Sequence, residues 1–414
     1  MPGRLFMAKG SAKVIALVAA FAMIYLDVRP YLKVLSTADL NDFHSRAIDN
    51  NRVTISLNYI DIGFVRRGLG GTIAHILSTD WIMSSLLFNL VSLLWLVAPL
   101  ALLIARLGSK LSSAAVLYLA VIVVLSPQTF LGWSPDLART DMLVSGFIAW
   151  AVLATMSHWR GVGLFMLLVG FLAHETAVIF GAPLLLVLNA EAYASGELDR
   201  GSATRLAAVF LGGLGMIVLS QALLSPPGPT IAAYMLRATP LGDYESGQSR
   251  DVAIYFMVSG IRGVKAAICY NLDYNRQSYL SALFCVMTLA VYVVILGLQK
   301  HIRAVFIAVF VPVIFMLLIA TDTGRWVKLG VINSWLLVVF YQLYGPNEKE
   351  LSFKAMLTGG LLFAGIFAMG PASIFYANTA TQVLTEKLGV PFDPDPAWIA
   401  LDKCDPAWRT LLWH

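Results

Sequence analysis

The chain has 414 residues, of which 58% are hydrophobic and 13% are charged, and its formal net charge is +5 at neutral pH. Soluble domains carry roughly 45–50% apolar and about 25% charged residues, so this composition excludes an ordinary soluble protein and indicates a polytopic membrane protein. The basic residues are scattered in short segments between apolar runs, which is typical of orientation signals and argues against a nucleic-acid-binding surface.

Apolar runs of about 17–25 residues predict membrane-spanning helices. We find about eleven, counting interrupted runs generously. They lie near residues 12–28, 81–105, 112–127, 140–157, 161–174, 175–190, 206–224, 277–298, 304–321, 329–345 and 354–371. No internal repeat or linker divides them. We therefore predict an all-α integral membrane protein with about eleven transmembrane helices, forming one domain over residues 1–371.

The basic residues predict the orientation of these spans. Arg4, Lys9 and Lys13 precede the first run, which by the positive-inside rule places the N-terminus in the cytoplasm. The later loops on that side are short and basic, at residues 106–110, 160, 200–205, 300–303 and 349–354. We predict a multi-pass protein of the cytoplasmic (inner) membrane. Signal-peptidase cleavage at Ala20-Phe21-Ala22 is the alternative to an uncleaved first span, and the fit of the later loops favours the uncleaved span.

An odd number of spans places the three longest polar regions on the outer face. These are a long first loop (29–80), a second long loop (225–276) and a C-terminal cap (372–414) rich in proline and tryptophan. The chain has three cysteines, Cys269, Cys285 and Cys404, without the spacing of a zinc or redox motif. Cys269 and Cys404 fall on the same oxidising side, and whether they pair is left open.

The fifth and sixth runs are short and are separated by His174-Glu175. We interpret them as two helices that meet at the outer surface. The alternative is one long kinked helix with a buried His-Glu pair, which would give ten spans and an inside C-terminus. The basic loops at 300–303 and 349–354 favour two helices.

Ionisable residues gather in four groups on the predicted outer face. A carboxylate there could take the proton from an acceptor hydroxyl, and arginines could hold the phosphate of a lipid-linked donor. The groups are Asp39, Asp42, His44, Asp49 and Asp61 with Arg66 and Arg67; Asp136, Arg139 and Asp141; His174 and Glu175; and Asp322 and Arg325 with Trp326.

Several of these residues have a simpler interpretation. Arg66 and Arg67 could be a juxtamembrane anchor on lipid phosphates, and Asp322 with Arg325 could be a local ion pair on one helical face. Trp326 beside Arg325 suits stacking on a sugar ring. The glycines after Arg67 would let the backbone approach a headgroup, but they form no nucleotide-binding motif.

Three segments resemble one family of enzymes. Asn41-Asp42-Phe43-His44-Ser45-Arg46-Ala47 is similar to the Asp-Phe-x-x-Tyr-x-Ala pattern after the first span of polyprenyl-phosphate-sugar-dependent glycosyltransferases of the GT-C superfamily, with Arg46 in place of the aromatic residue. Arg139-Thr140-Asp141-Met142-Leu143 resembles their Asp-x-Leu span opening. Gly170 to Ala177 resembles their short helix ending in Leu-(Thr/Ala)-Lys-Glu-x-Ala, with His174 where lysine is common.

The resemblance implies roles for three acids: Asp42 as the base that activates the acceptor, and Asp141 and Glu175 as supporting residues at neighbouring helix ends. It does not assign Arg66, Arg67 or Arg325, which we select from charge and position alone. We expect these arginines to bind substrate together with Asp39, His44, Asp61, Arg139, His174, Asp322 and Trp326.

The predicted function is therefore transfer of a sugar from a polyprenyl-phosphate-linked donor to a glycan, lipid or protein acceptor, in contact with membrane lipids and without nucleic acid. We predict no metal site and no cofactor, and a divalent cation is left open. The first alternative is a polysaccharide polymerase or ligase acting on lipid-pyrophosphate glycans, for which Arg262, Arg276 and Arg325 would matter most. A transporter would place its charges near the bilayer midplane, often in two repeated halves. A structural scaffold is the remaining alternative.

Overall fold

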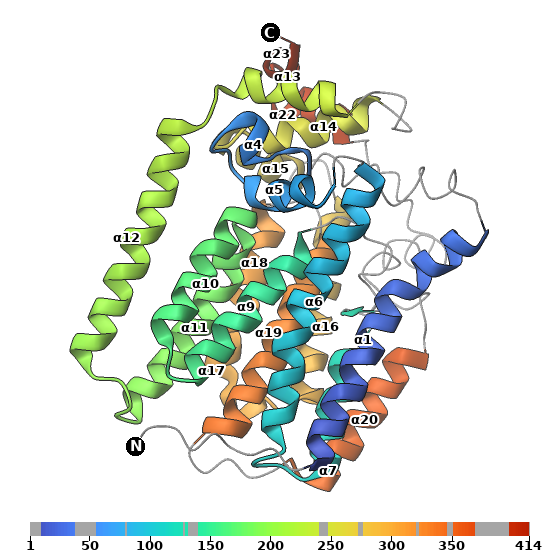
Figure 1. The fold of residues 1–414 in the computed structure, drawn as a ribbon, viewed down its shortest axis with the longest axis vertical. Coiled ribbons are helices and arrows are strands. Elements are labelled where there is room, and N and C mark those ends of the chain that lie inside the picture. Colours follow the sequence, from blue (N-terminus) through green and yellow to red (C-terminus); the bar gives the residue numbers. More distant parts are fainter. Residues whose placement is uncertain are drawn as a thin grey trace.

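A computed structural model describes residues 10–37, 55–78, 81–126, 129–130, 140–239, 247–271, 276–319, 323–345, 351–368 and 397–413. Within these ranges the chain forms helices and no β-strand (Figure 1). The elements are α1 (Gly10–Thr37), α4 (Tyr59–Ile62), α5 (Gly68–Leu77), α6 (Trp81–Leu107), α7 (Ser113–Leu125), α9 (Asp141–Met156), α10 (Arg160–Ala173), α11 (Thr176–Ala194), α12 (Arg200–Leu224), α13 (Gly228–Ala238), α14 (Gly247–Val258), α15 (Ile261–Cys269), α16 (Arg276–Ile295), η4 (Gln299–His301), α17 (Ile302–Val305), the π-helical η5 (Phe306–Phe310), α18 (Val311–Ile319), α19 (Thr323–Tyr344), α20 (Phe353–Ala368), α22 (Ala397–Cys404) and α23 (Thr410–Trp413).

Six segments of the described chain are long and apolar enough to cross a membrane. They are Gly10–Arg29, Met83–Leu107, Thr176–Ala194, Arg200–Leu224, Gln299–Ile319 and Arg325–Tyr344. Shorter apolar helices occupy the other five predicted runs: α7, α9, α10, α20 and the Ala282–Ile295 part of α16. The helices α7, α9, α10 and α20 have 13 to 16 residues each and extend only about 20–24 Å, whereas the whole of α16 has 20 residues and extends about 30 Å. The chain is an all-α membrane protein, and the total of about eleven spans stays a prediction.

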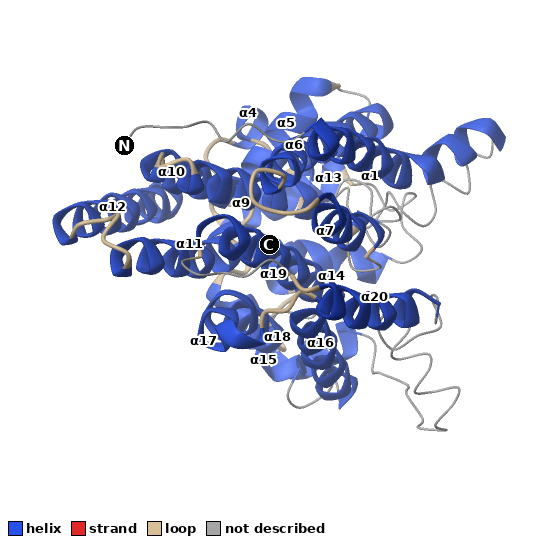
Figure 2. Ribbon diagram, turned by 90° about the horizontal axis from the view of Figure 1, so that it is seen from below, coloured by secondary structure: helices blue, strands red, loops and turns tan. Residues whose placement is uncertain are grey.

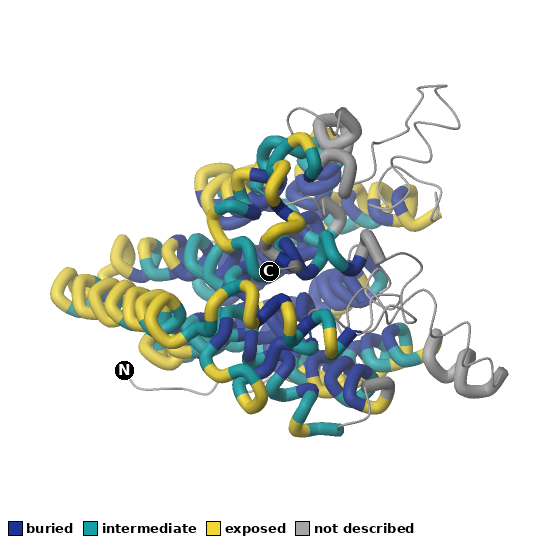
Figure 3. The backbone as a smooth tube through the Cα atoms, turned by 90° about the horizontal axis from the view of Figure 1, so that it is seen from above, coloured by how far each residue is buried: buried dark blue, intermediate teal, exposed yellow. Residues whose placement is uncertain are grey.

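Two helices form the centre of the bundle. In the candidate span of α19 every residue from Trp326 to Leu343 is buried, and every residue of α9 except Trp150 is buried. The two helices pack against each other and against α6 and α11. Seen from above, the buried positions gather in the middle of the molecule (Figure 3). Residues at the first turns of α9 and α19 are therefore held by a packed core.

Polar side chains of α19 tie it to three neighbours. Asn333 Nδ2 donates to the carbonyl oxygens of Phe180, at 2.9 Å, and Ala308, at 2.8 Å. Trp335 Nε1 donates to the carbonyl oxygen of Leu119 at 2.8 Å. A buried polar group costs free energy unless it is hydrogen-bonded, so these bonds favour one rotation of α19 over others.

The chain turns back between α10 and α11. A side chain on Gly170 would meet Ala177, and one on Gly181 would meet Leu167, so these pairs face each other on either side of the turn. His174 has an extended backbone and ends α10, and α11 begins at Thr176. Two antiparallel helices, rather than one kinked helix, therefore form this region, as the basic loops indicated.

One helix, α12, stands at the edge of the bundle. It packs against α10 and touches α11, and none of its residues is buried. Figure 2 shows it beside these two helices at the margin of the bundle, and its exposed positions are yellow in Figure 3. Its apolar side chains face the surroundings of the bundle, which for a membrane span means lipid.

The three segments assigned to one face by the orientation rule pack together at one end of the bundle, which we call the capped end. Residues from the first loop, the second loop and the C-terminal segment share one hydrophobic cluster: Leu57 and Val65; Ile231, Ala232, Met235, Ile254, Tyr255 and Ala266; and Leu401, Trp408 and Leu412. Figure 1 shows α4, α5, α13, α14, α15, α22 and α23 together there.

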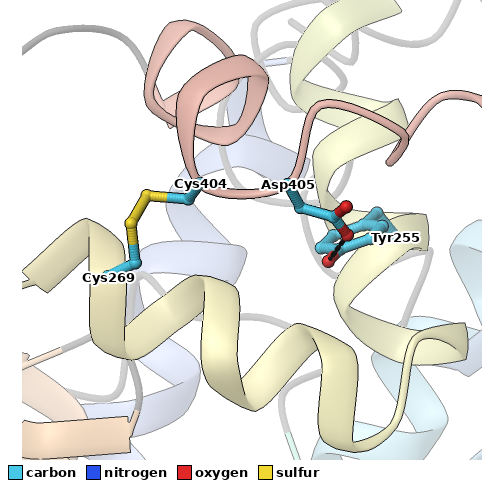
Figure 4. The surroundings of a disulfide bond; sticks show 4 residues. All are labelled: Tyr255, Cys269, Cys404 and Asp405. Carbon is cyan, nitrogen blue, oxygen red and sulfur yellow. Dashed lines mark hydrogen bonds between the residues drawn. A yellow bond between two sulfur atoms is a disulfide. The ribbon is translucent and has the colours of Figure 1, made fainter.

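A disulfide bond ties two of these segments. Cys269 at the end of α15 is bonded to Cys404 at the end of α22, and Cys285 is free and buried. Beside the bond, Asp405 accepts a hydrogen bond from the Tyr255 hydroxyl at 2.6 Å (Figure 4). It also accepts from the Arg262 guanidinium at 2.5 and 2.6 Å. The pairing that the sequence left open is therefore present.

Candidate functional site

Six ionisable residues meet at the capped end and form what we call the charged cluster: Arg66, Arg67, Asp141, His174, Glu175 and Arg325. Their positions are linked electrostatically, because His174 experiences the charges of Arg67, Glu175, Arg325 and Asp141. They come from four places in the chain: the turn before α5, the α10–α11 turn and the first turns of α9 and α19. Four predicted groups thus each contribute to one site.

The turn before α5 is set by close packing. Arg67 precedes α5 with a left-handed backbone, φ 62°, a conformation that costs a non-glycine residue about 1–2 kcal/mol. A side chain on Gly68 would overlap the Tyr59 ring, and one on Gly71 would overlap the Leu57 carbonyl oxygen. These two glycines therefore let α5 pack on the preceding segment. This corrects the expectation that they open the backbone to a headgroup.

Glu175 neutralises part of the arginine pair. Its Oε1 accepts from both Arg66 and Arg67, and its Oε2 accepts from Arg67 Nε at 2.9 Å. Burial favours a higher pKa for Glu175, but the charges and hydrogen bonds of Arg67, with the further positive field at the site, hold this pKa well below its usual value. Glu175 is therefore an anion at neutral pH, at the N-terminus of α11, where a negative charge is favoured.

His174 is neutral at physiological pH. Its side chain is buried, and burial together with the nearby charge of Arg67 lowers its pKa to about 3. Its Nδ1 accepts from the Thr176 backbone N–H at 3.2 Å and lies 2.9 Å from the Thr176 hydroxyl oxygen. The neutral ring therefore carries its proton on Nε2. At this position, where the resemblance suggests lysine, the protein has a neutral donor instead of a cation.

Asp141 and Arg325 form a bidentate ion pair between the two central helices. Arg325 Nε donates to Asp141 Oδ2 at 2.7 Å, and Arg325 Nη2 donates to Asp141 Oδ1. Asp141 is buried at the first residue of α9. Arg325 thus has a partner far away in the sequence. Asp322, with which a local ion pair was considered, lies outside the described residues.

The position of Trp326 differs from the expectation. Its ring is buried, stacked on Phe180 with centroids 6.4 Å apart, and the Arg325 guanidinium lies 5.2 Å from its centre. It is part of the core beneath the charged cluster and has no open face for a sugar ring. Its indole N–H is buried and has no hydrogen-bond partner in the part of the chain that the structure describes.

Asp61 belongs to a separate set of contacts. It accepts from Asn58 Nδ2 at 2.9 Å and from the Tyr234 hydroxyl at 2.8 Å, and His75 Nδ1 lies 3.8 Å away. The hydrogen bonds from Asn58 and Tyr234 lower the pKa of Asp61. Asp61 thus joins the first loop to α13.

Four further predicted residues, Asp39, Asp42, His44 and Arg139, lie outside the described residues. Two residues at the site carried no clear signal in the sequence. Thr176 orients His174, and Met257 Sδ lies 3.1 Å from Arg67 Nη1. The place of Thr176, directly after His-Glu at a helix start, was the only hint.

The charge balance indicates what the cluster can bind. Three arginines against two carboxylates, with His174 neutral, leave a net charge of +1 (3 − 2). Of the two arginines that contact Glu175, Arg66 is the more accessible: 38% of its side chain is exposed, against 19% for Arg67. Such a site favours an anion, and guanidinium groups match a phosphate bidentately. No group of three or more metal-ligating side chains is formed within the part of the chain that the structure describes.

The low pKa of His174 predicts a pH dependence of stability. Below pH 6.5 the unfolded chain protonates this histidine while the folded protein keeps it neutral until about pH 3. The unfolded state then binds more protons, so the free energy of unfolding is expected to fall by about 1.4 kcal/mol per pH unit as the pH drops from 6.5. In His174→Gln this contribution should disappear, as measured by thermal unfolding in detergent between pH 7 and 4.5. Parallel curves for the two proteins would contradict a neutral His174.

Comparison of the chain with protein-family models, with curated proteins and with solved structures finds no match in any of the three.

Proposed function

We propose that the protein transfers a sugar from a polyprenyl-phosphate-linked donor to a glycan, lipid or protein acceptor at the capped end of the bundle, on the outer face of the cytoplasmic membrane. The observation that carries the proposal is the charged cluster. It brings Asp141, His174 and Glu175, from two of the three segments that resemble GT-C glycosyltransferases, to one place with Arg66, Arg67 and Arg325.

The arginines would bind the donor phosphate. Glu175 is shared by two guanidinium groups, so Arg66 and Arg67 together have more donors than its two oxygens can accept. Arg66 is partly exposed and can turn to an incoming phosphate. The positive field would also stabilise the charge that develops on the phosphate as it leaves the sugar.

The supporting acids would hold this arrangement. Asp141 fixes Arg325, and Glu175 fixes Arg67, so each carboxylate orients a cation at a helix end. The acceptor base would be Asp42, which follows the end of α1 by five positions in the sequence. That role rests on the resemblance alone.

Substitution of Asp42 tests the base directly. In a strain from which the gene is deleted, the lipid-linked sugar donor should accumulate, and the wild-type gene should remove it. Asp42→Asn is expected to lower turnover by about 10²–10⁴-fold, the usual contribution of a general base, and to leave the donor accumulated at normal protein levels. Asp49→Asn, in the same loop, is the matched control and should restore turnover. Full turnover by Asp42→Asn would overturn the assignment of the base, and a deletion strain without accumulated lipid-linked sugar would count against the activity.

A polymerase or ligase acting on lipid-pyrophosphate glycans is the second candidate. The net positive charge of the cluster suits a lipid pyrophosphate as well as it suits a lipid phosphate. Arg262, one of the arginines first considered for this reaction, is held by Asp405 under the cap. The side chain of Arg276 lies outside the described residues, so of the three arginines named for this reaction only Arg325 is at the charged cluster, where Arg66 and Arg67 would join it. Greater loss of turnover in Arg66→Gln than in Asp42→Asn would favour this candidate over the first.

A further inference from the structure

A carboxyl group lies inside the bundle, away from the charged cluster. Asp27 is in the candidate span Gly10–Arg29 of α1 and is completely buried. It shares a face of the helix with Met23 and Ala19, which are also buried. This face packs against α6. An ionisable residue within a membrane span is costly and usually has a function.

The contacts of Asp27 are incomplete. Asn89 on α6 donates from Nδ2 to Asp27 Oδ2 at 2.9 Å. Among the described residues, the other oxygen of each side chain, Asp27 Oδ1 and Asn89 Oδ1, is buried without a hydrogen-bond partner, and so is the hydroxyl of Ser92 one turn further along α6. The two side-chain oxygens can only accept, and the Ser92 hydroxyl, which could donate, has no described partner within hydrogen-bond distance, so neither oxygen receives a donor.

No cation is placed to balance an ionised Asp27 among the described side chains that pack on it. On α1, Arg29 is exposed and lies only two positions from Asp27, so it faces another side of the helix. On α6 the charged residue is Arg106, about 26 Å along the helix from Asn89. The neighbouring α7 has no charged residue, and its titratable Tyr118 donates to the Ile295 carbonyl oxygen.

An anion in this position would have one neutral hydrogen bond in apolar surroundings, which is strongly unfavourable. A single proton on the carboxyl group removes the charge and also supplies the missing donor. We propose that Asp27 and Asn89 form a proton-binding site between α1 and α6, with the proton on Asp27 Oδ1 in the folded protein. The inference does not depend on the proposed transferase activity.

Infrared spectroscopy tests the protonation state directly. Purified protein in lipid nanodiscs at pH 7 should show the carbonyl band of a protonated carboxylic acid, and Asp27→Asn should lose it. Asp199→Asn is the matched control, because Asp199 is an exposed helix cap and should not contribute to the band. In Asn89→Leu the acid remains but loses its hydrogen-bond donor, so the band should move to higher frequency. Identical spectra for the wild type and Asp27→Asn would overturn the proposal.

Stability measurements distinguish a proton from a metal cation. If the folded state holds a proton that the unfolded chain releases above about pH 4, the folded state binds more protons. The stability of the wild type relative to Asp27→Asn should then fall as the pH rises. Sodium chloride and choline chloride should give the same unfolding temperature. If sodium but not choline stabilised the wild type, and Asp27→Asn lost this effect, the site would bind a sodium ion and not a proton. If the stability of the wild type relative to Asp27→Asn rose with pH, Asp27 would not be protonated in the folded protein.

Discussion

Asp141→Asn is expected to lower the free energy of unfolding by about 3 kcal/mol. The substitution leaves Arg325 without its carboxylate between two central helices, and breaking a buried ion pair from one side typically costs about 3–5 kcal/mol. We expect the lower end of this range because 18% of the Arg325 side chain is exposed. Thermal and denaturant unfolding of the purified protein in detergent measure the loss. Asp199→Asn provides the surface control, with a change within about 0.5 kcal/mol.

The double variant Asp141→Leu with Arg325→Met distinguishes the contribution of the ion pair from the cost of leaving one buried charge unpaired. Removing both charges leaves no uncompensated ion, so most of the stability lost in Asp141→Asn should return. Turnover should not return, because Arg325 is then absent from the proposed phosphate site. If the double variant lost as much free energy of unfolding as its two single variants together, the two residues would not act as a pair.

Cys404→Ser is expected to release the C-terminal segment from the capped end. The bond joins residues 135 positions apart, and loss of a native disulfide typically costs about 2–5 kcal/mol. Limited proteolysis should cut within residues 397–413 sooner in this variant, and the unfolding temperature should fall.

Reduction provides the internal control for the disulfide. Dithiothreitol should reproduce the effect of Cys404→Ser on the wild type and should have no further effect on the variant. With the bond intact, Cys285 is the one cysteine that remains as a thiol, and it is buried, so thiol reagents should label the native protein poorly. Equal protease sensitivity of oxidised and reduced wild type would show that the Arg262–Asp405 and Tyr255–Asp405 contacts hold the segment without the disulfide.

The helices were predictable because their signal is local. An apolar run with few charges marks each helix of the bundle, and the His174-Glu175 break separates α10 from α11, whereas the short helices of the capped end are not predicted by such runs. Segment lengths were less decisive. Four helices in the predicted runs, α7, α9, α10 and α20, are shorter than a hydrocarbon core, so apolar sequence alone does not fix how many helices cross it.

The contact partners of the site residues were less predictable than the helices, because residues far apart in the sequence meet only in the packed structure. For Arg325 the sequence offers an acid three positions away, Asp322, but it does not point to Asp141, a partner 184 positions away. The position of Trp326 beside a charged residue suggests an open surface, but its ring is already in the core. The neutral state of His174 follows from burial and from its arginine neighbour, which the sequence does not display.

The exposed helix α12 has a consequence for the choice of membrane mimetic. With no buried residue and α10 as its main contact, α12 gains little from protein packing, so its tilt responds to the hydrophobic thickness around it. Its 25 residues extend about 38 Å, against a hydrocarbon layer of about 30 Å. Thin and thick bilayers should therefore change the inclination of α12 while the central helices α9 and α19 keep theirs, which makes α12 a natural place for a spectroscopic label that reports lipid thickness.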